Sequence, residues 1–121
     1  MNERDRDAIA ELSPQEVAKL MVGGRILLID VREPDEYALQ RIPGALLYPL
    51  STFDASTLPA DEPRPVVFHC GSGKRSATAA SARLAAGVPH TAHLAGGIAA
   101  WIAAGLPVVQ IDPATGKPVS K

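Results

Sequence analysis

The sequence has little cysteine, little net charge and no long apolar segment, and each shortage excludes a class of protein. One cysteine among 121 residues cannot form a disulfide within the chain, which favours a reducing, cytoplasmic location. A net charge of −1 gives no overall attraction to nucleic acid or to an acidic membrane surface. No apolar run approaches the ~20 residues of a membrane-spanning helix, and the charged start, MNERDRDAIAE, lacks the pattern of a signal peptide.

The residues that are present suffice for one hydrophobic core. Hydrophobic residues make up 46% of the chain and charged residues 21%, as in an ordinary globular domain. The length predicts a single domain. We assign residues 1–10 to a charged N-terminal segment, residues 11–109 to the domain and residues 110–121 to a loosely ordered tail. The Cys and His residues do not have metal-site spacing, and we expect neither a metal nor another cofactor.

Apolar runs alternate with helical patterns along the chain. Runs typical of buried strands occupy residues 25–31, 45–50, 66–69 and 90–96. Helical patterns occupy residues 13–22, 33–41, 74–86 and 97–105. This alternation predicts an α/β fold with a mostly parallel sheet and helices on both faces. In such a sheet the working site lies beyond the carboxyl ends of the strands.

The single cysteine, Cys70, follows the third apolar run and therefore stands at the carboxyl end of a strand. The loop after it consists of Gly71, Ser72, Gly73, Lys74, Arg75 and Ser76. Two glycines in three residues let backbone N–H groups turn inward, and the next helix adds its unpaired N–H donors. Together with the two cations, these donors favour a thiolate. The loop predicts a nucleophilic cysteine inside a cradle that binds anions.

Histidines near this cysteine are candidates for a general base. His69 precedes Cys70, but adjacent residues of a strand point to opposite faces, so we predict a structural role for it. His90 and His93 are expected to be ordinary surface or boundary residues. A lone cysteine is itself more often a small buried hydrophobic residue, and only the flanking sequence favours the nucleophile.

Three segments make the chain similar to a single-domain rhodanese, a thiosulfate sulfurtransferase. They are IDVREPDEYALQRIPGA (29–45), VVFHCGSGKRS (66–76) and HLAGGIAAWIAAGLPV (93–108), in the order of that family. The resemblance implies the rhodanese-like fold, with about five strands in a mostly parallel sheet and helices on both faces. It also implies that the Cys70 thiolate takes the outer sulfur of thiosulfate, releases sulfite and passes sulfur from a persulfide to cyanide or a thiol.

The same resemblance implies roles for the residues of the loop. The N–H groups from Gly71 to Ser76 would bind the donor and stabilise the persulfide. Arg75 aligns with the arginine that closes the loop in this family. Lys74 either attracts the anionic donor or is an ordinary solvent-exposed charge.

Other positions match or depart from the family pattern. Asp30 and Arg32 are expected to brace neighbouring loops through hydrogen bonds rather than to take part in the chemistry. Gly71 stands where a larger, often basic residue is common, which predicts a wider pocket and bears on the choice of donor. Arg41 replaces a frequent histidine and Ala95 a commonly acidic residue, and both changes are expected to affect surface contacts only.

Three other functions compete with this reading. Cysteine phosphatases, some of which share the fold, place five residues between Cys and Arg, whereas four separate Cys70 from Arg75 and make a smaller ring. A module that relays sulfur only between proteins would keep the same loop. A dithiol oxidoreductase is excluded because the chain has no second thiol. The expected partners are a small-molecule sulfur donor and a thiol or cyanide acceptor, or proteins in these roles, and neither nucleic acid nor membrane.

Overall fold

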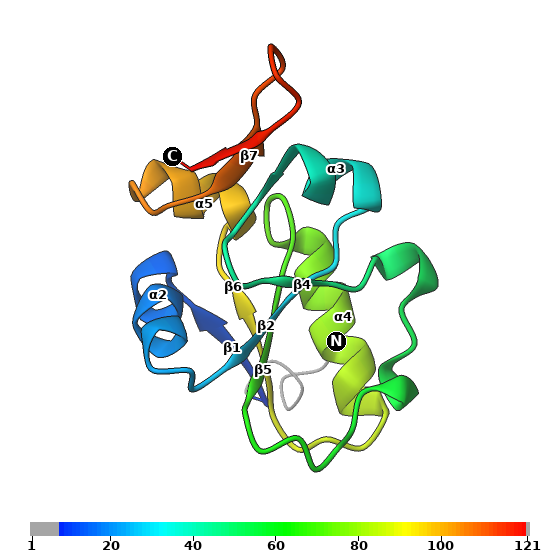
Figure 1. Cartoon of the computed structure of the whole chain (residues 1–121). Helices are drawn as coiled ribbons and strands as arrows, with labels where there is room; N and C mark the ends of the chain where they lie inside the picture. The colour runs from blue at the N-terminus through cyan, green and yellow to red at the C-terminus, as the bar shows by residue number, and fades with distance from the viewer. Residues whose placement is uncertain (1–7, 121) are drawn as a thin grey trace.

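The computed structural model describes residues 8–120, and a five-stranded sheet runs through its centre (Figure 1). The strands are all parallel and lie in the order β1-β6-β5-β2-β4. They are β1 (Ile9–Leu12), β2 (Leu27–Asp30), β4 (Leu46–Leu47), β5 (Val66–His69) and β6 (Thr91–Leu94). The predicted α/β fold with a five-stranded parallel sheet is confirmed.

Helices cover both faces of this sheet. Helices α2 (Pro14–Val22) and α5 (Gly97–Ala103) pack on one face, and α4 (Lys74–Ala85) packs on the other. The chain also forms α3 (Pro34–Leu39) and two 3₁₀ turns, η1 (Leu50–Thr52) and η2 (Ala55–Thr57). Within residues 8–120 no helix has the length and apolar character needed to cross a membrane.

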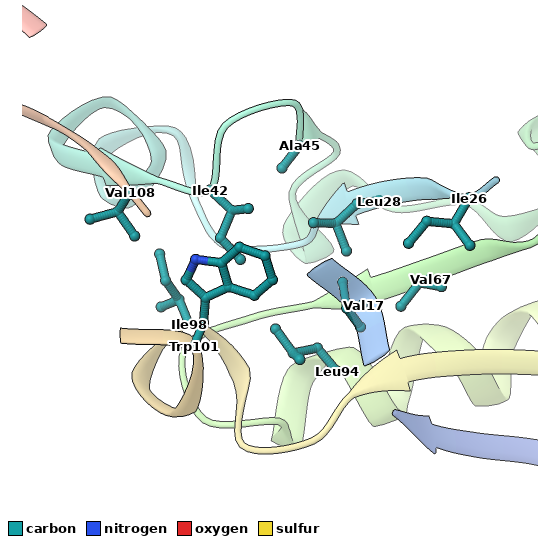
Figure 2. Close-up of a cluster of buried hydrophobic side chains, with 10 residues drawn as sticks. All are labelled: Val17, Ile26, Leu28, Ile42, Ala45, Val67, Leu94, Ile98, Trp101 and Val108. Carbon is teal, nitrogen blue, oxygen red and sulfur yellow. The ribbon is translucent and has the colours of Figure 1, made fainter. Parts of the chain in front are cut away.

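Alternate residues of the central strands form two separate cores. Leu28, Val67 and Leu94 belong to the first core, which also contains Trp101 of α5 (Figure 2). Their sequence neighbours point the other way, and Phe68 joins the second core beneath α4. This is the two-residue period of a strand. Because both faces are covered, these strands read in the sequence as continuous apolar runs.

The tail differs from its prediction. The sequence predicts little order in residues 110–121, whereas β7 (Val109–Ile111) and β8 (Pro118–Ser120) form an antiparallel hairpin. Strand β7 also pairs with β3 (Gln40–Arg41), which is far away in the sequence. No local sequence pattern therefore predicts this pairing. The predicted N-terminal segment, residues 1–10, lies mostly outside the described residues, and its last two residues belong to β1.

Candidate active site

The loop after β5 wraps its backbone around the sulfur of Cys70. The N–H of Gly73 donates to Sγ at 3.1 Å, and the N–H of Ser76 donates to it at 3.3 Å. Gly73 is the N-cap residue of α4, and its φ of +105° is an angle that residues with a side chain rarely adopt. This turn aims the unpaired N–H groups at the start of α4 towards the sulfur.

These hydrogen bonds lower the pKa of Cys70 below its ordinary value. Burial is the largest single influence and raises the pKa, because it disfavours the charged thiolate. The N–H and hydroxyl of Ser76 and the N–H groups of Gly73 and Ser72 act in the opposite direction and together outweigh it. Cys70 is only 1% exposed, so these donors work where water does not compete with them.

Across residues 8–120, neither cation of the loop donates a hydrogen bond to the Cys70 sulfur. Arg75 reaches α3, where its Nη1 and Nη2 donate to Oε1 and Oε2 of Glu36 at 2.7 and 3.0 Å. The hydrogen bonds from Arg75 lower the pKa of Glu36 to about 2, and the same bonds raise the pKa of Arg75. Lys74 is exposed at the first turn of α4. Hydrogen bonds from the loop, rather than contacts with a cation, therefore stabilise the thiolate.

Glu36 is a site residue that sequence analysis missed. In the sequence it reads as an acid in the first turn of a helix, where it complements the helix dipole. In the structure its carboxylate also binds Arg75. Arg75 lies beside the loop, because a Cβ on Gly71 would stand 3.2 Å from Arg75 Nη2. The partner is 39 residues away, so only the packing of α3 against the start of α4 reveals the pair.

The start of α5 holds the opposite side of the loop. The N–H of Ile98 donates to the Cys70 carbonyl at 2.8 Å, and the N–H of Ala99 donates to the Gly71 carbonyl at 3.2 Å. Gly97 permits this approach, because a Cβ there would lie 2.5 Å from the Cys70 carbonyl oxygen. With its carbonyls bound to α5, the loop keeps its N–H groups directed at the sulfur.

Asp30 and Arg32 form a buried ion pair at the end of β2. Arg32 Nη2 donates to Asp30 Oδ2 at 2.8 Å and to the Gln40 carbonyl at 2.6 Å, while the Arg32 N–H donates to Asp30 Oδ1 at 2.9 Å. Asp30 is fully buried and Arg32 is 5% exposed. The pair ties the end of β2 to the residue that follows α3, the helix that carries Glu36.

His69 faces this ion pair. Its Nε2 lies 3.4 Å from Asp30 Oδ2, and its Nδ1 lies 3.4 Å from the carbonyl oxygen of Cys70. Burial lowers the pKa of His69, and the Asp30 carboxylate opposes that shift. The described residues hold no cluster of three or more His, Cys, Asp or Glu side chains placed to bind a metal ion.

His93 differs from its prediction as a surface or boundary residue. It is 6% exposed, and its Nδ1 lies 2.9 Å from Ser76 Oγ, which in turn lies 3.6 Å from Cys70 Sγ. Parallel pairing of β5 with β6 sets His93 beside Phe68, two residues before the cysteine. The sequence holds no signal for this contact, because it depends on strand order. His90 is exposed, as expected.

Known proteins share this fold and much of this sequence. The family model for the rhodanese-like domain matches residues 13–104. An uncharacterized protein from Synechocystis sp. is 38% identical over 99 residues, which cover 82% of this chain and 55% of that protein. A sulfurtransferase from Allochromatium vinosum is 38% identical over 84 residues, which cover 69% of this chain and 78% of that protein.

One solved structure with a similar fold has a different functional description. A protein of unknown function from Rhodopseudomonas palustris, described as a possible tyrosine phosphatase, matches with a TM-score of 0.75 at 28% identity. The match covers 86% of this chain and 87% of that one. Proteins of similar fold are therefore described as a sulfurtransferase and as a possible phosphatase. The fold does not distinguish these two reactions, so the distinction depends on the residues of the loop.

Proposed function

Because this chain belongs to the rhodanese-like domain family, which includes a named sulfurtransferase, we propose that it transfers a sulfane sulfur through a persulfide on Cys70. The strongest support is the convergence of the Gly73 and Ser76 N–H groups on Sγ. These donors favour the thiolate, which is the form that attacks sulfur.

In the proposed first half-reaction, the Cys70 thiolate attacks the outer sulfur of thiosulfate. A bond forms between Sγ and that sulfur, the sulfur–sulfur bond of thiosulfate breaks, and sulfite leaves with the bonding electrons. In the second half-reaction, cyanide or a thiolate attacks the terminal sulfur of the persulfide. The acceptor departs as thiocyanate or a new persulfide, and Cys70 returns as a thiolate. This is covalent catalysis with ping-pong kinetics.

We assign the N–H groups from Gly71 to Ser76 to binding the terminal sulfur and the charge that develops on it. Lys74 is exposed at the first turn of α4, where its positive charge attracts an anionic donor. Arg75, bound to Glu36, holds the end of the loop in place. Asp30 and Arg32 act indirectly, by holding the end of β2. Because a free thiol nucleophile needs a reducing compartment, we propose the cytoplasm as the location.

A relay between proteins would use the same persulfide. Cys70 is 1% exposed, so a small donor reaches Sγ with less rearrangement of the loop than a partner protein requires. This burial supports a free donor such as thiosulfate. Protein donors or acceptors remain the second candidate for this site.

Phosphatase activity is the third candidate, because of the Rhodopseudomonas palustris protein. Two observations oppose it. Four residues rather than five separate Cys70 from Arg75, and the Arg75 guanidinium already binds the Glu36 carboxylate through two hydrogen bonds. Cys70-dependent hydrolysis of a chromogenic phosphate ester would show that this reading is correct and ours is wrong.

Intact mass spectrometry after incubation with thiosulfate tests the proposal directly. We expect the wild-type chain to gain the mass of one sulfur atom and to lose it on addition of cyanide, with no gain in Cys70→Ser. Loading only from the persulfide of a cysteine desulfurase would favour the relay. No loading from either donor would overturn the proposed function.

A further inference from the structure

The buried hydroxyl of Ser76 contacts both the imidazole of His93 and the sulfur of Cys70. Ser76 Oγ lies 2.9 Å from His93 Nδ1, 3.6 Å from Cys70 Sγ and 3.1 Å from the Gly73 carbonyl oxygen. Ser76 is fully buried and His93 is 6% exposed. The three side chains come from the end of β5, the first turn of α4 and β6, so the tertiary fold alone assembles this row.

The Ser76 hydroxyl has a single proton, and three groups lie near enough to accept it. They are the Gly73 carbonyl, Cys70 Sγ and His93 Nδ1. The Gly73 carbonyl also accepts the N–H of Ala77, at 3.2 Å, so it does not depend on Ser76. When Cys70 is a thiolate, its sulfur can only accept, and the Ser76 proton stabilises it by turning towards Sγ. The lone pairs of Ser76 Oγ then face His93. Their 2.9 Å contact is a hydrogen bond only when His93 Nδ1 carries a proton.

We infer that His93 is a positioning residue for the sulfur transfer, and that its Nδ1–H donates to Ser76 Oγ and thereby directs the Ser76 hydroxyl towards the Cys70 sulfur. The catalytic consequence rests on the proposed function of Cys70. The imidazole acts through Ser76 and is not itself in contact with the reacting atoms. The same arrangement supports the persulfide, since its inner sulfur keeps a hydrogen-bond donor.

The groups around His93 permit this proton on Nδ1. Strand β1 places Glu11 beside it in register, with Oε2 3.9 Å from His93 Nε2. Strand β5 contributes the apolar Phe68, α4 contributes Ser76, and Cys70 lies across that hydroxyl. The Glu11 side chain is 70% exposed, so it can turn to solvent when the imidazole is neutral. Both the imidazolium and the neutral Nδ1–H tautomer can therefore donate to Ser76.

Titration of the thiolate by its ultraviolet absorbance tests the inference without a sulfur donor. Cys70 is the only cysteine, so Cys70→Ser provides the blank. His93→Leu keeps a similar volume and removes the donor, whereas His93→Asn keeps a side-chain N–H near the place of Nδ1. His90→Asn alters an exposed histidine three residues earlier and is the matched control. Ser76→Ala removes the hydroxyl on which His93 acts.

We expect His93→Leu to raise the pKa of Cys70, because a bond that supports a charge is lost. The acid dissociation constant of the thiol should fall roughly three- to tenfold, and with it the thiolate fraction at any pH below that pKa. His93→Asn should restore most of this fraction, and His90→Asn should leave it unchanged. In the Ser76→Ala background, His93→Leu should add nothing further.

An unchanged titration in His93→Leu, or a shift of equal size with and without the Ser76 hydroxyl, would overturn the inference. Loading by thiosulfate is measured on the same proteins by intact mass. If the titrations behave as expected and the wild-type chain takes sulfur neither from thiosulfate nor from a desulfurase persulfide, the proposed function fails while the link from His93 to Cys70 stands. If the chain loads sulfur and the titrations do not respond, the reverse holds.

Discussion

Arg75 and Glu36 bind each other through two side-by-side hydrogen bonds, of 2.7 and 3.0 Å, between the start of α4 and the first turn of α3. Glu36 also accepts the N–H of Glu33 at 3.0 Å, so it caps its own helix while it holds the arginine. The pair anchors the end of the loop whose N–H groups surround Cys70. Both side chains are more than one-third exposed, at 38% and 36%, so solvent screens their attraction.

The free energy of unfolding in acid should depend on the Arg75–Glu36 pair. The pKa of Glu36 is lowered from 4.5 to about 2, so its contribution is complete above pH 4.5 and is lost as the pH falls towards 2. We expect Glu36→Gln to lower the free energy of unfolding by less than about 1 kcal/mol at neutral pH, given the screening. Urea unfolding at several pH values measures this. The two proteins should converge near pH 2, and a difference that persists there would contradict the assignment.

The buried ion pair of Asp30 and Arg32 should contribute far more to stability than the exposed pair of Arg75 and Glu36. Asp30→Asn removes one charge and leaves Arg32 buried without its partner, which typically costs about 3–5 kcal/mol. The exposed pair of Arg64 and Glu62, with a 3.0 Å contact, provides the control. Glu62→Gln should cost less than about 1 kcal/mol in the same urea titration. Equal losses for the two variants would show that the buried pair has no special weight.

Gly97 should not tolerate a side chain. Gly97→Ala would bring a Cβ to 2.5 Å from the Cys70 carbonyl oxygen and 2.6 Å from Gly71 backbone atoms, which forces α5 and the loop apart. We expect a loss of about 2 kcal/mol or more in unfolding free energy, together with slower sulfur loading.

Gly105→Ala is the control for backbone strain. Gly105 has a similar φ of +76° but no atom within 4 Å of the added Cβ, so it should lose only about 1 kcal/mol and load sulfur normally. If loading slows equally in both variants, the close approach of α5 to the loop is not what shapes the site.

Sulfur loading should reach its maximal rate at a lower pH than an ordinary thiol allows. The pKa of Cys70 is lowered because the hydrogen bonds of the loop outweigh its burial, and the thiolate is the attacking form. Single-turnover loading by thiosulfate, followed against pH, should therefore show its inflection below the usual cysteine pKa of about 8.5.

Ser76→Ala removes one of the donors that lower this pKa and should move the inflection to higher pH. Thr78→Ala, which removes an exposed hydroxyl of the same helix, is the control and should leave it in place. An inflection at the ordinary thiol pKa in the wild-type chain would contradict the account of the loop.

Short-range patterns in the sequence determined the elements and the local surroundings of Cys70. Ser13 and Glu16 cap α2 reciprocally at 3.1 Å, as their spacing predicts. The apolar run before Cys70 predicted a buried strand, and the glycines after it predicted a turn that directs N–H groups inward. These features depend on residues within one or two turns of each other, so a sequence read locally contains them.

Tertiary packing alone decided which side chains from distant parts of the sequence meet. Glu36 is 39 residues from Arg75, His93 is 17 residues from Ser76, and Gln40 pairs with Gln110 across 70 residues. Each contact depends on strand order or on the docking of a helix. Such contacts arise from the burial of apolar faces elsewhere in the chain, which brings polar groups together without leaving a spacing that can be read in advance.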